Sequence, residues 1–241
     1  MNKVVTPYQS KESKKEQVTQ MFDSIAPTYD KLNRIMTVGI DILWRRKAVK
    51  LLAPYQPKVM ADIATGTGDF AIESMRLKPT KIYGIDISPQ MLEVGKVKMK
   101  KLGYDKVIEM TVGDSEKLLL EDNSIDAITI GFGVRNFEDL KQGLSEVLRV
   151  LRPGGAVVIL EPSFPTMFPL KQLFNLHFKV LTPMVGKLIS GDDSAYKYLP
   201  ESVGAFPNGQ DFLNICTEVG FKKGTYHPLT FGMCSMYLLE K

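Results

Sequence analysis

A glycine-rich stretch in the first third of the chain carries the clearest chemical signal. It runs Asp62-Ile-Ala-Thr-Gly-Thr-Gly-Asp69, between apolar residues typical of a buried strand and a segment with helical spacing. Glycine has no Cβ, so the backbone amides of such a turn can approach a ligand closely. Gly66, Thr67 and Gly68 therefore predict a binding turn for an adenosine-bearing cofactor.

Three polar residues further along the chain fit the same ligand. Asp86 ends the next predicted strand about twenty residues after the glycines, where its carboxylate can accept both hydrogen bonds from a ribose diol. Asp114 and Ser115 follow the third strand. The Asp114 carboxylate could accept a hydrogen bond from the exocyclic amine of adenine.

Charge decides between two cofactors. The segment Gly66–Ala71 also satisfies the loose glycine pattern of dinucleotide-binding proteins, and a ribose-binding acid occurs in NAD enzymes and S-adenosylmethionine enzymes alike. Asp62 and Asp69 would repel a pyrophosphate at this turn, whereas they would attract the sulfonium and amino group of S-adenosylmethionine. We predict S-adenosylmethionine, with an NAD-dependent dehydrogenase as an alternative. For Asp62 and Asp114 the alternative role is to cap a helix or turn.

Strand and helix patterns alternate from residue 58 onward. Strands are expected at Val59–Ile63, Lys81–Asp86, Val107–Val112, Ile125–Gly131 and Ala156–Leu160, and helices at Phe70–Leu77, Pro89–Leu102, Leu140–Leu151 and Gln210–Val219. This order predicts a parallel sheet with helices on both faces. Residues 222–226 and 234–239 alternate like paired antiparallel strands. The expected fold is α/β, a Rossmann-like, mostly parallel seven-stranded sheet with a C-terminal antiparallel hairpin, the layout of class I S-adenosylmethionine-dependent methyltransferases.

Two further helices are expected before the sheet, at Val18–Ile25 and Ile40–Leu52, with a proline turn over Ala26–Asp30 between them. We interpret residues 1–55 as an N-terminal helical lid and residues 56–241 as the cofactor-binding core. Residues 164–205 interrupt the alternation and are interpreted as a lid insertion within that core.

The composition excludes several classes of protein. The 241 residues, 44% hydrophobic and 24% charged with a net charge of +4, are typical of a globular domain. The lysines within 11–15 and 96–101 are interpreted as solvated helix faces, with loose attraction to anionic lipid or nucleic acid as the alternative. The sequence lacks a dense basic stripe with interleaved aromatic residues, which argues against a nucleic-acid target. We expect a cytoplasmic protein, because the sequence shows neither a secretory signal nor an apolar run of membrane-spanning length.

The cysteines and histidines do not suggest a metal site. Cys216 and Cys234 belong to no Cys-x-x-Cys pair, and both histidines are isolated. We expect two reduced, buried thiols and no bound metal.

The N-terminal segment resembles one enzyme family. Tyr29-Asp30-Lys31-Leu32-Asn33, followed by Thr37, Asp41 and Trp44, is similar to an element of the C-methyltransferases of menaquinone and ubiquinone biosynthesis. Family members carry a histidine where this chain has Asp41. That difference argues against an essential proton-transfer role at the position.

Two later elements strengthen the resemblance. Arg149-Val-Leu-Arg-Pro-Gly-Gly155, then Glu161-Pro-Ser163, match the family without exception, and Gly131-Phe-Gly-Val-Arg-Asn136 corresponds to its loop after the fourth strand. The resemblance implies cofactor contacts at Thr67, Asp86, Asp114 and Ser115, and at Gly131, where some relatives have serine.

The resemblance also implies methyl transfer to a ring carbon of a prenylated naphthoquinol. Arg135 is then the candidate partner of the quinol phenolate, and Asn136 would orient a ring oxygen or a water. Since an arginine cannot act as a base, proton removal falls to water, Asp30 or Tyr29. The alternatives are a salt bridge for Arg135, simple packing for Tyr29 and an Asx-turn for Asp30.

The insertion is the expected cover of the substrate. It is rich in apolar residues, including Phe168, Phe174, Phe178 and Met184, which predicts contact with the ring and the start of the isoprenoid tail at a membrane surface. Core packing or the face of a homodimer is the alternative. The nearest competing function is methylation of another quinol or small aromatic acceptor, because fold does not fix substrate. The second is a nucleic-acid-directed or non-catalytic cofactor-binding protein.

Overall fold

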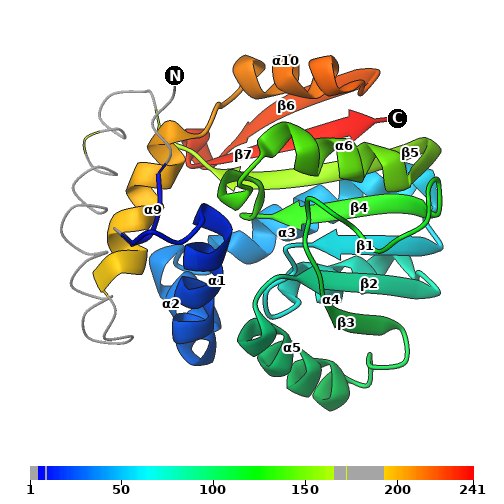
Figure 1. Ribbon diagram of the computed structural model, residues 1–241. Coiled ribbons are helices and arrows are strands. Elements are labelled where there is room, and N and C mark those ends of the chain that lie inside the picture. Colours follow the sequence, from blue (N-terminus) through cyan, green and yellow to red (C-terminus); the bar gives the residue numbers. More distant parts are fainter. Residues whose placement is uncertain (1–4, 9, 166–171, 173–192) are drawn as a thin grey trace.

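Short apolar runs in the sequence build the centre of the molecule. The computed structural model describes residues 5–8, 10–165, 172 and 193–241. Its strands are β1 (Val59–Ile63), β2 (Lys81–Asp86), β3 (Ile108–Val112), β4 (Ile125–Gly131), β5 (Leu151–Pro162), β6 (Lys223–Leu229) and β7 (Cys234–Glu240). They form one seven-stranded sheet in the order β3-β2-β1-β4-β5-β7-β6 (Figure 1). β1 to β5 are parallel, and β7 runs antiparallel to both β5 and β6.

The described α-helices are α1 (Lys14–Ile25), α2 (Tyr29–Met36), α3 (Ile40–Leu52), α4 (Asp69–Ser74), α5 (Pro89–Leu102), α6 (Leu140–Val150), α9 (Asp193–Ala205) and α10 (Gln210–Val219). Short 3-10 turns lie at Ala26–Thr28, Ala53–Tyr55, Met75–Leu77, Val134–Asn136 and Thr230–Gly232.

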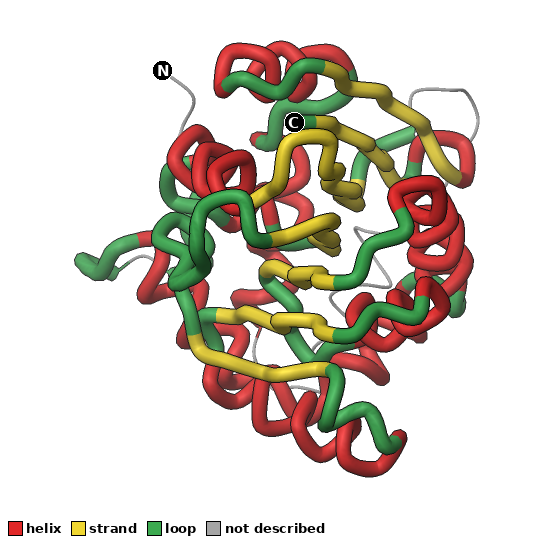
Figure 2. The backbone as a smooth tube through the Cα atoms, turned by 90° about the vertical axis from the view of Figure 1, so that its right-hand side faces the viewer, coloured by secondary structure: helices red, strands yellow, loops and turns green. Residues whose placement is uncertain are grey.

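Helices cover both faces of the sheet, as Figure 2 shows. Side chains of a strand point alternately to the two faces, so a strand buried on both sides must be apolar throughout. In β4, Ala127 packs in the cluster that includes α3, α4 and α5, while its neighbour Ile128 packs in the cluster that includes α6 and α10. The apolar run Ala156–Leu160 of β5 follows from this double burial, and the buried Thr129 of β4 is bonded to Asp62.

Most of the predicted elements are confirmed, including the antiparallel hairpin and the helix α10, which ends at Gly220 in a left-handed conformation. Two of the described helices, α2 and α9, were missed. The proline turn is a short 3-10 helix over Ala26–Thr28, and α2 then begins at Tyr29, so Tyr29 and Asp30 are helical residues. Proline is tolerated in the first turn of a helix because its missing N–H has no partner there.

β5 is longer than predicted. Arg152-Pro-Gly-Gly155 lies inside it as an irregularity, with a register shift against β4 and a φ of +79° at Gly154. The strand keeps its direction past this bulge, so Glu161 and Ser163 lie at the carboxyl ends of the parallel strands.

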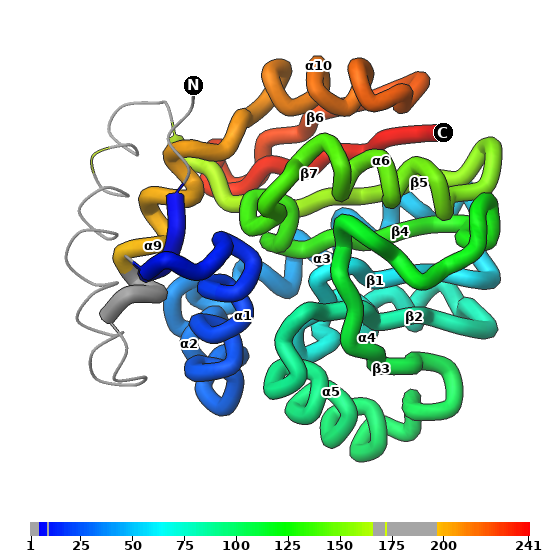
Figure 3. The backbone as a smooth tube through the Cα atoms, in the orientation of Figure 1, coloured from blue at the N-terminus to red at the C-terminus, as the bar shows by residue number. Residues whose placement is uncertain are grey.

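The N-terminal helices gather at the carboxyl ends of the parallel strands (Figure 3). α1 is fixed by a capping box between Ser13 and Glu16. α1 and α2 share an apolar cluster with Met91 of α5 and Tyr198 of α9. α3 instead packs against the sheet through Trp44, so the segment that covers the strand ends is α1 and α2. A division of the chain at residue 55 stays a prediction.

The apolar side chains predicted to cover the substrate (Phe168, Phe174, Phe178 and Met184) lie outside the described residues. Among the residues that are described, no helix is long and apolar enough to cross a membrane.

Candidate active site

The glycine-rich turn between β1 and α4 is fixed by the buried carboxylate of Asp62. Asp62 is fully buried and accepts hydrogen bonds from Thr65 Oγ1 (2.5 Å), the Ala71 amide (3.1 Å) and Thr129 Oγ1 of β4 (2.6 Å). Gly68 has a φ of +84°, a conformation that favours glycine. The predicted binding turn is confirmed as a turn. Asp62 fixes the conformation of the turn through these hydrogen bonds, which use both of its carboxylate oxygens.

Asp86 lies at the end of β2 beside this turn. Its carboxylate accepts from the Gly66 amide (2.7 Å) and from the Ser88 amide (2.9 Å). A carboxylate offers about four lone-pair sites, so the capacity for a diol remains. The position agrees with the ribose-binding role that the sequence predicts for Asp86.

A cavity opens between α1 and the carboxyl ends of the strands. The predicted residues Gly66, Asp86, Asp114, Ser115 and Gly131 line it, and the rest of its wall includes Lys15, Val18, Phe22, Tyr29, Ala64, Ile87, Met91, Glu116, Phe132, Gly133, Asn136 and Phe137. Its three carboxylates, those of Asp86, Asp114 and Glu116, and its apolar side chains match the donors and the ring of an adenosine. The residues present therefore fit S-adenosylmethionine.

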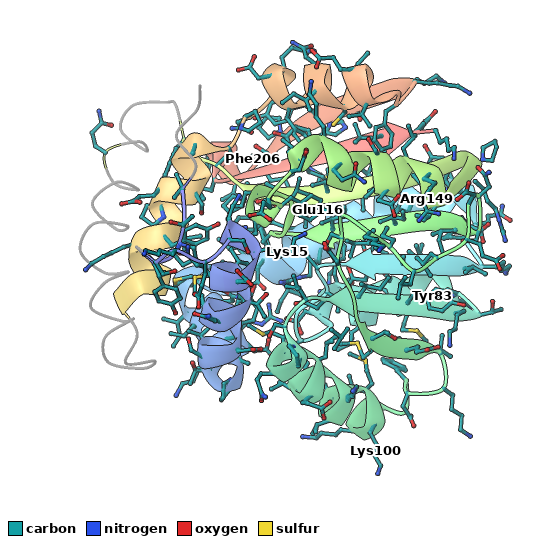
Figure 4. All side chains as sticks on the ribbon, in the orientation of Figure 1. Lys15, Tyr83, Lys100, Glu116, Arg149 and Phe206 are labelled. Atoms are coloured by element: carbon teal, nitrogen blue, oxygen red, sulfur yellow. The ribbon has the colours of Figure 1, made fainter. Side chains whose placement is uncertain are left out.

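The lysines at the start of α1 are not a solvated tail, and that prediction is wrong. Lys15 Nζ pairs with Asp114 (2.7 Å) and Glu116 (3.2 Å), and Figure 4 shows Lys15 and Glu116 facing each other. Lys14 Nζ donates to the carbonyls of Arg135 (3.0 Å) and Phe137 (2.7 Å). Burial lowers the pKa of Lys14. These contacts fasten α1 over the cavity.

A second set of contacts docks α2 on the glycine-rich turn. Asp30 accepts from Thr67 Oγ1 (2.5 Å) and from Lys98 Nζ (2.8 Å), and Lys98 also pairs with Asp69 (2.6 Å). Lys98 is therefore not part of a solvated face, unlike Lys100, which points away from the protein in Figure 4. Thr67 and Asp30 lie together as predicted site residues, but Asp30 lines neither described cavity.

Tyr29 stands between the cofactor cavity and a second, smaller cavity, and lines both. Its ring meets Phe22 edge-on with centroids 6.0 Å apart. Burial raises the pKa of Tyr29, so at neutral pH the phenol is protonated. A protonated phenol can donate a hydrogen bond but is poorly suited to act as a base.

The loop after β4 brings Arg135 and Asn136 to the same edge. Arg135 Nη1 pairs with Glu161 (3.1 Å) and donates to the Phe132 carbonyl, and both charged side chains are at least nine-tenths buried. Burial raises the pKa of Glu161, although Arg135 opposes the effect. Asn136 lines the cofactor cavity and accepts from the hydroxyl of Tyr198 (3.0 Å). The salt bridge that was the alternative for Arg135 is present.

Arg135 nevertheless retains a free donor. Its Nε is buried and has no hydrogen-bond partner among the described residues. Buried polar atoms are almost always bonded, so an orphaned one requires an explanation.

Close packing accounts for the glycines of this loop. A Cβ on Gly133 would lie 2.4 Å from the Cβ of Ala64, and one on Gly131 would lie 2.9 Å from the ring of Phe70. Relatives with serine at the position of Gly131 must therefore place that ring differently. Ala64 and Phe132 adopt positive φ values of 53° and 61°. Strained backbone of this kind concentrates at functional sites.

The second cavity was missed by sequence analysis. It is lined by Tyr29, Arg45, Asp62, Ala64, Thr65, Gly66, Thr67, Asp69, Phe70 and Gly131. Arg45 comes from α3 and pairs with Asp41, which also pairs with Arg34 of α2. The only sequence signal was the position of Arg45 directly after Trp44 in the family element.

No group of three or more potential metal ligands occurs among the described residues. Cys216 and Cys234 are free and buried, and burial raises the pKa of both thiols.

The fold and the cavity define the class of protein. Its sheet resembles that of a SAM-dependent methyltransferase of Thermotoga maritima, with a TM-score of 0.64 and 19% identity over 92% of this chain and 99% of that one. A second such structure, from Methanococcus maripaludis, gives a TM-score of 0.59 and 19% identity over 97% and 96%. At these identities the comparison establishes the fold, which is that of the class I S-adenosylmethionine-dependent methyltransferases, as predicted.

The sequence comparison is more specific. The profile of the ubiE/COQ5 methyltransferase family matches residues 9–241, and the chain belongs to this family. It is an S-adenosylmethionine-dependent methyltransferase. Demethylmenaquinone methyltransferase of Bacteroides fragilis is 48% identical over 98% of this chain and 97% of its own. The ubiquinone/menaquinone biosynthesis C-methyltransferase UbiE of Geotalea daltonii is 46% identical over 95% and 97%.

The buried carboxylate of Asp62 predicts a pH-dependent stability. Burial raises its pKa from 3.8 to about 6, against the hydrogen bonds from Thr129, Thr65 and Ala71. Because the folded pKa exceeds the unfolded one, its contribution to stability is fully present below pH 3.8 and is lost as the pH rises through about 6. The Asp62→Asn variant has no titrating carboxylate at this position, so it should not lose this stability as the pH rises. We expect its unfolding free energy, relative to that of the parent protein, to rise by about 3 kcal/mol across this range in urea titrations.

Asp126→Asn is the matched control. Hydrogen bonds from the Val59 and Lys58 amides lower the pKa of Asp126 despite its partial burial. The unfolding free energy of Asp126→Asn, relative to that of the parent protein, should therefore fall as the pH rises. A pH-independent difference for Asp62→Asn would contradict the prediction.

Proposed function

We propose that this protein methylates demethylmenaquinol at a ring carbon to give menaquinol, a late step of menaquinone biosynthesis. The observation that carries the proposal is the loop after β4, which presents Asn136 to the cofactor cavity and carries, in the preceding residue, the buried and unbonded Nε of Arg135. The names of the relatives support the choice of acceptor, since several are demethylmenaquinone methyltransferases. Another quinol or small aromatic ring remains the alternative acceptor.

The chemistry of the acceptor requires the reduced quinol. S-adenosylmethionine supplies an electrophilic methyl group when bound. A quinone ring is electron-poor, whereas loss of a phenolic proton moves electron density onto the unsubstituted ring carbon. That carbon forms the new C–C bond as the sulfur–methyl bond breaks, and loss of its hydrogen as a proton restores the aromatic ring.

The protein must then stabilise a phenolate and exclude water. In our proposal the Nε of Arg135 donates to the phenolate oxygen, while Glu161 holds the guanidinium from the other side. Asn136 keeps its amide nitrogen for a ring oxygen, because its carbonyl already accepts from Tyr198. A fixed donor in a site shielded from water stabilises developing charge strongly.

The phenolic proton goes to water in this scheme. Asp30 accepts hydrogen bonds from Thr67 and from the charged Lys98, which disfavours it as the base. Tyr29 has a raised pKa, which suits a hydrogen-bond donor at the point where the two cavities meet.

The proposal is tested with methyl-labelled S-adenosylmethionine and demethylmenaquinone, supplied with and without a chemical reductant. We expect label in the quinone fraction only under reducing conditions, because only the quinol has a nucleophilic carbon. If the protein binds the methyl donor but transfers no label to the lipid, the family assignment stands and demethylmenaquinol is excluded as the acceptor.

The role of Arg135 requires a variant that keeps the ion pair. Arg135→Ala would leave Glu161 as an unpaired buried charge, which costs about 3 to 5 kcal/mol of stability. Arg135→Lys keeps a positive charge beside Glu161 but loses the Nε donor. We expect turnover to fall about 100-fold with the affinity for S-adenosylhomocysteine unchanged.

Arg152→Lys is the control, since Arg152 pairs with Asp126 at the other end of β5. It should turn over like the parent protein. Parent-like turnover of Arg135→Lys would exclude the Nε donor from the mechanism.

Contact with a membrane surface is the second part of the proposal, because the acceptor is a lipid. The exposed Ile35, Val38 and Leu43 around the α2–α3 turn give an apolar face on the side of the N-terminal helices. We expect the protein to float with lipid vesicles, and less so when Val38 and Leu43 are both changed to Ser. A homodimer stays an alternative use of such a face. Flotation equal for the two proteins would contradict docking through this turn.

A further inference from the structure

Arg45 is a buried cation that the proposed reaction leaves without a role. Its side chain is 9% exposed and lines the second cavity. This cavity shares Tyr29, Ala64, Gly66 and Gly131 with the cofactor cavity, so the two meet across the glycine-rich turn. A ligand that fills the first cavity and extends past Gly66 would reach Arg45.

The guanidinium of Arg45 is held from two sides. Its Nη1 donates to Asp41, which is 1% exposed and also accepts from Thr37 Oγ1 (2.8 Å). The central carbon of the guanidinium lies 5.6 Å from the ring centroid of Phe132. An arginine held in this way loses little freedom when it binds a carboxylate.

Arg45 has unused donors, whereas the carboxylates around it are already bonded. Within the described residues, its Nε and Nη2 make no hydrogen bond, and neither atom is completely buried. Asp69 is paired with Lys98 (2.6 Å) and Arg34 (2.8 Å) and lies 4.0 Å from Nη1 of Arg45, and both oxygens of Asp62 accept hydrogen bonds. A cavity with free donors and occupied acceptors suits an anionic group.

We infer that Arg45 binds the carboxylate at the methionine end of S-adenosylmethionine, and that Asp41 is its positioning residue. The inference rests on the methyl donor and not on the acceptor proposed above. Asp86 and Asp114 line the first cavity, where we expect the ribose and the adenine, and the oxygens of Asp114 also accept from Lys15 and from the Glu116 amide. The rest of the molecule must then extend toward the second cavity, and its carboxylate is the only anionic group it carries. Charge-assisted pairs of arginine and carboxylate are among the strong hydrogen bonds in proteins.

The test compares two ligands by calorimetry. S-adenosylhomocysteine carries the carboxylate, and its decarboxylated analogue keeps the amine but lacks it. The parent protein should bind S-adenosylhomocysteine about 10- to 100-fold more tightly than the analogue. In Arg45→Met this preference should disappear, with the affinity for the analogue changed less than about threefold.

Two further variants complete the test. Arg45→Lys keeps the charge beside Asp41 and should retain part of the preference. Arg46→Met is the matched control, because Arg46 follows Arg45 on α3 but is half exposed and faces Glu73; it should behave like the parent. If Arg45→Met weakens both ligands equally, Arg45 is structural and the inference is overturned. Since the readout is binding, failure of the quinol assignment would leave it unaffected.

Discussion

The rest of the site depends on the buried carboxylate of Asp62, which connects two strands, the glycine-rich turn and a helix. It sits in β1 next to β4, where the strand order β3-β2-β1-β4-β5 changes direction along the chain. Such a switch point leaves a crevice outside the carboxyl ends of the strands. Asp62 bonds across this point to Thr129 of β4, to Thr65 of the turn and to the first turns of α4 through Ala71. The cofactor cavity opens where these connections fix the backbone.

A network of charges then joins the N-terminal helices to that turn. Lys98 of α5, Asp30 and Arg34 of α2, and Asp69 of α4 form one connected set of ion pairs. Salt bridges at a protein surface contribute little individually, but partly buried networks are less screened by water. The network encloses the turn with charged groups whose partners are other residues of the protein. Among the described residues, Arg45 and Arg135 keep guanidinium donors without a hydrogen-bond partner, and our proposals assign these donors to ligands.

The two loops that flank the cavity constrain each other. Ala64 after β1 and Phe132 after β4 both adopt positive φ values, and Gly133 allows the Cα positions to approach closely. Phe132 also lies beneath the guanidinium of Arg45 and supplies a carbonyl to Arg135. One residue thus contacts both arginines, Arg45 through its ring and Arg135 through its carbonyl.

Local patterns in the sequence were enough to predict the strands, the order of the elements and the places of Asp86 and Asp114 at the ends of their strands. Apolar runs and glycine turns act over a few residues, so β1, β2 and β4 and the positions of Asp86 and Asp114 could be derived locally. Only the tertiary structure decided how charges are paired, because the partners lie far apart along the chain. Lys15 pairs with Asp114 and Lys98 with Asp30, where periodicity suggested solvated faces. The same reason hid Arg45: an arginine on an amphipathic helix acquires a role only when folding places a cavity beside it.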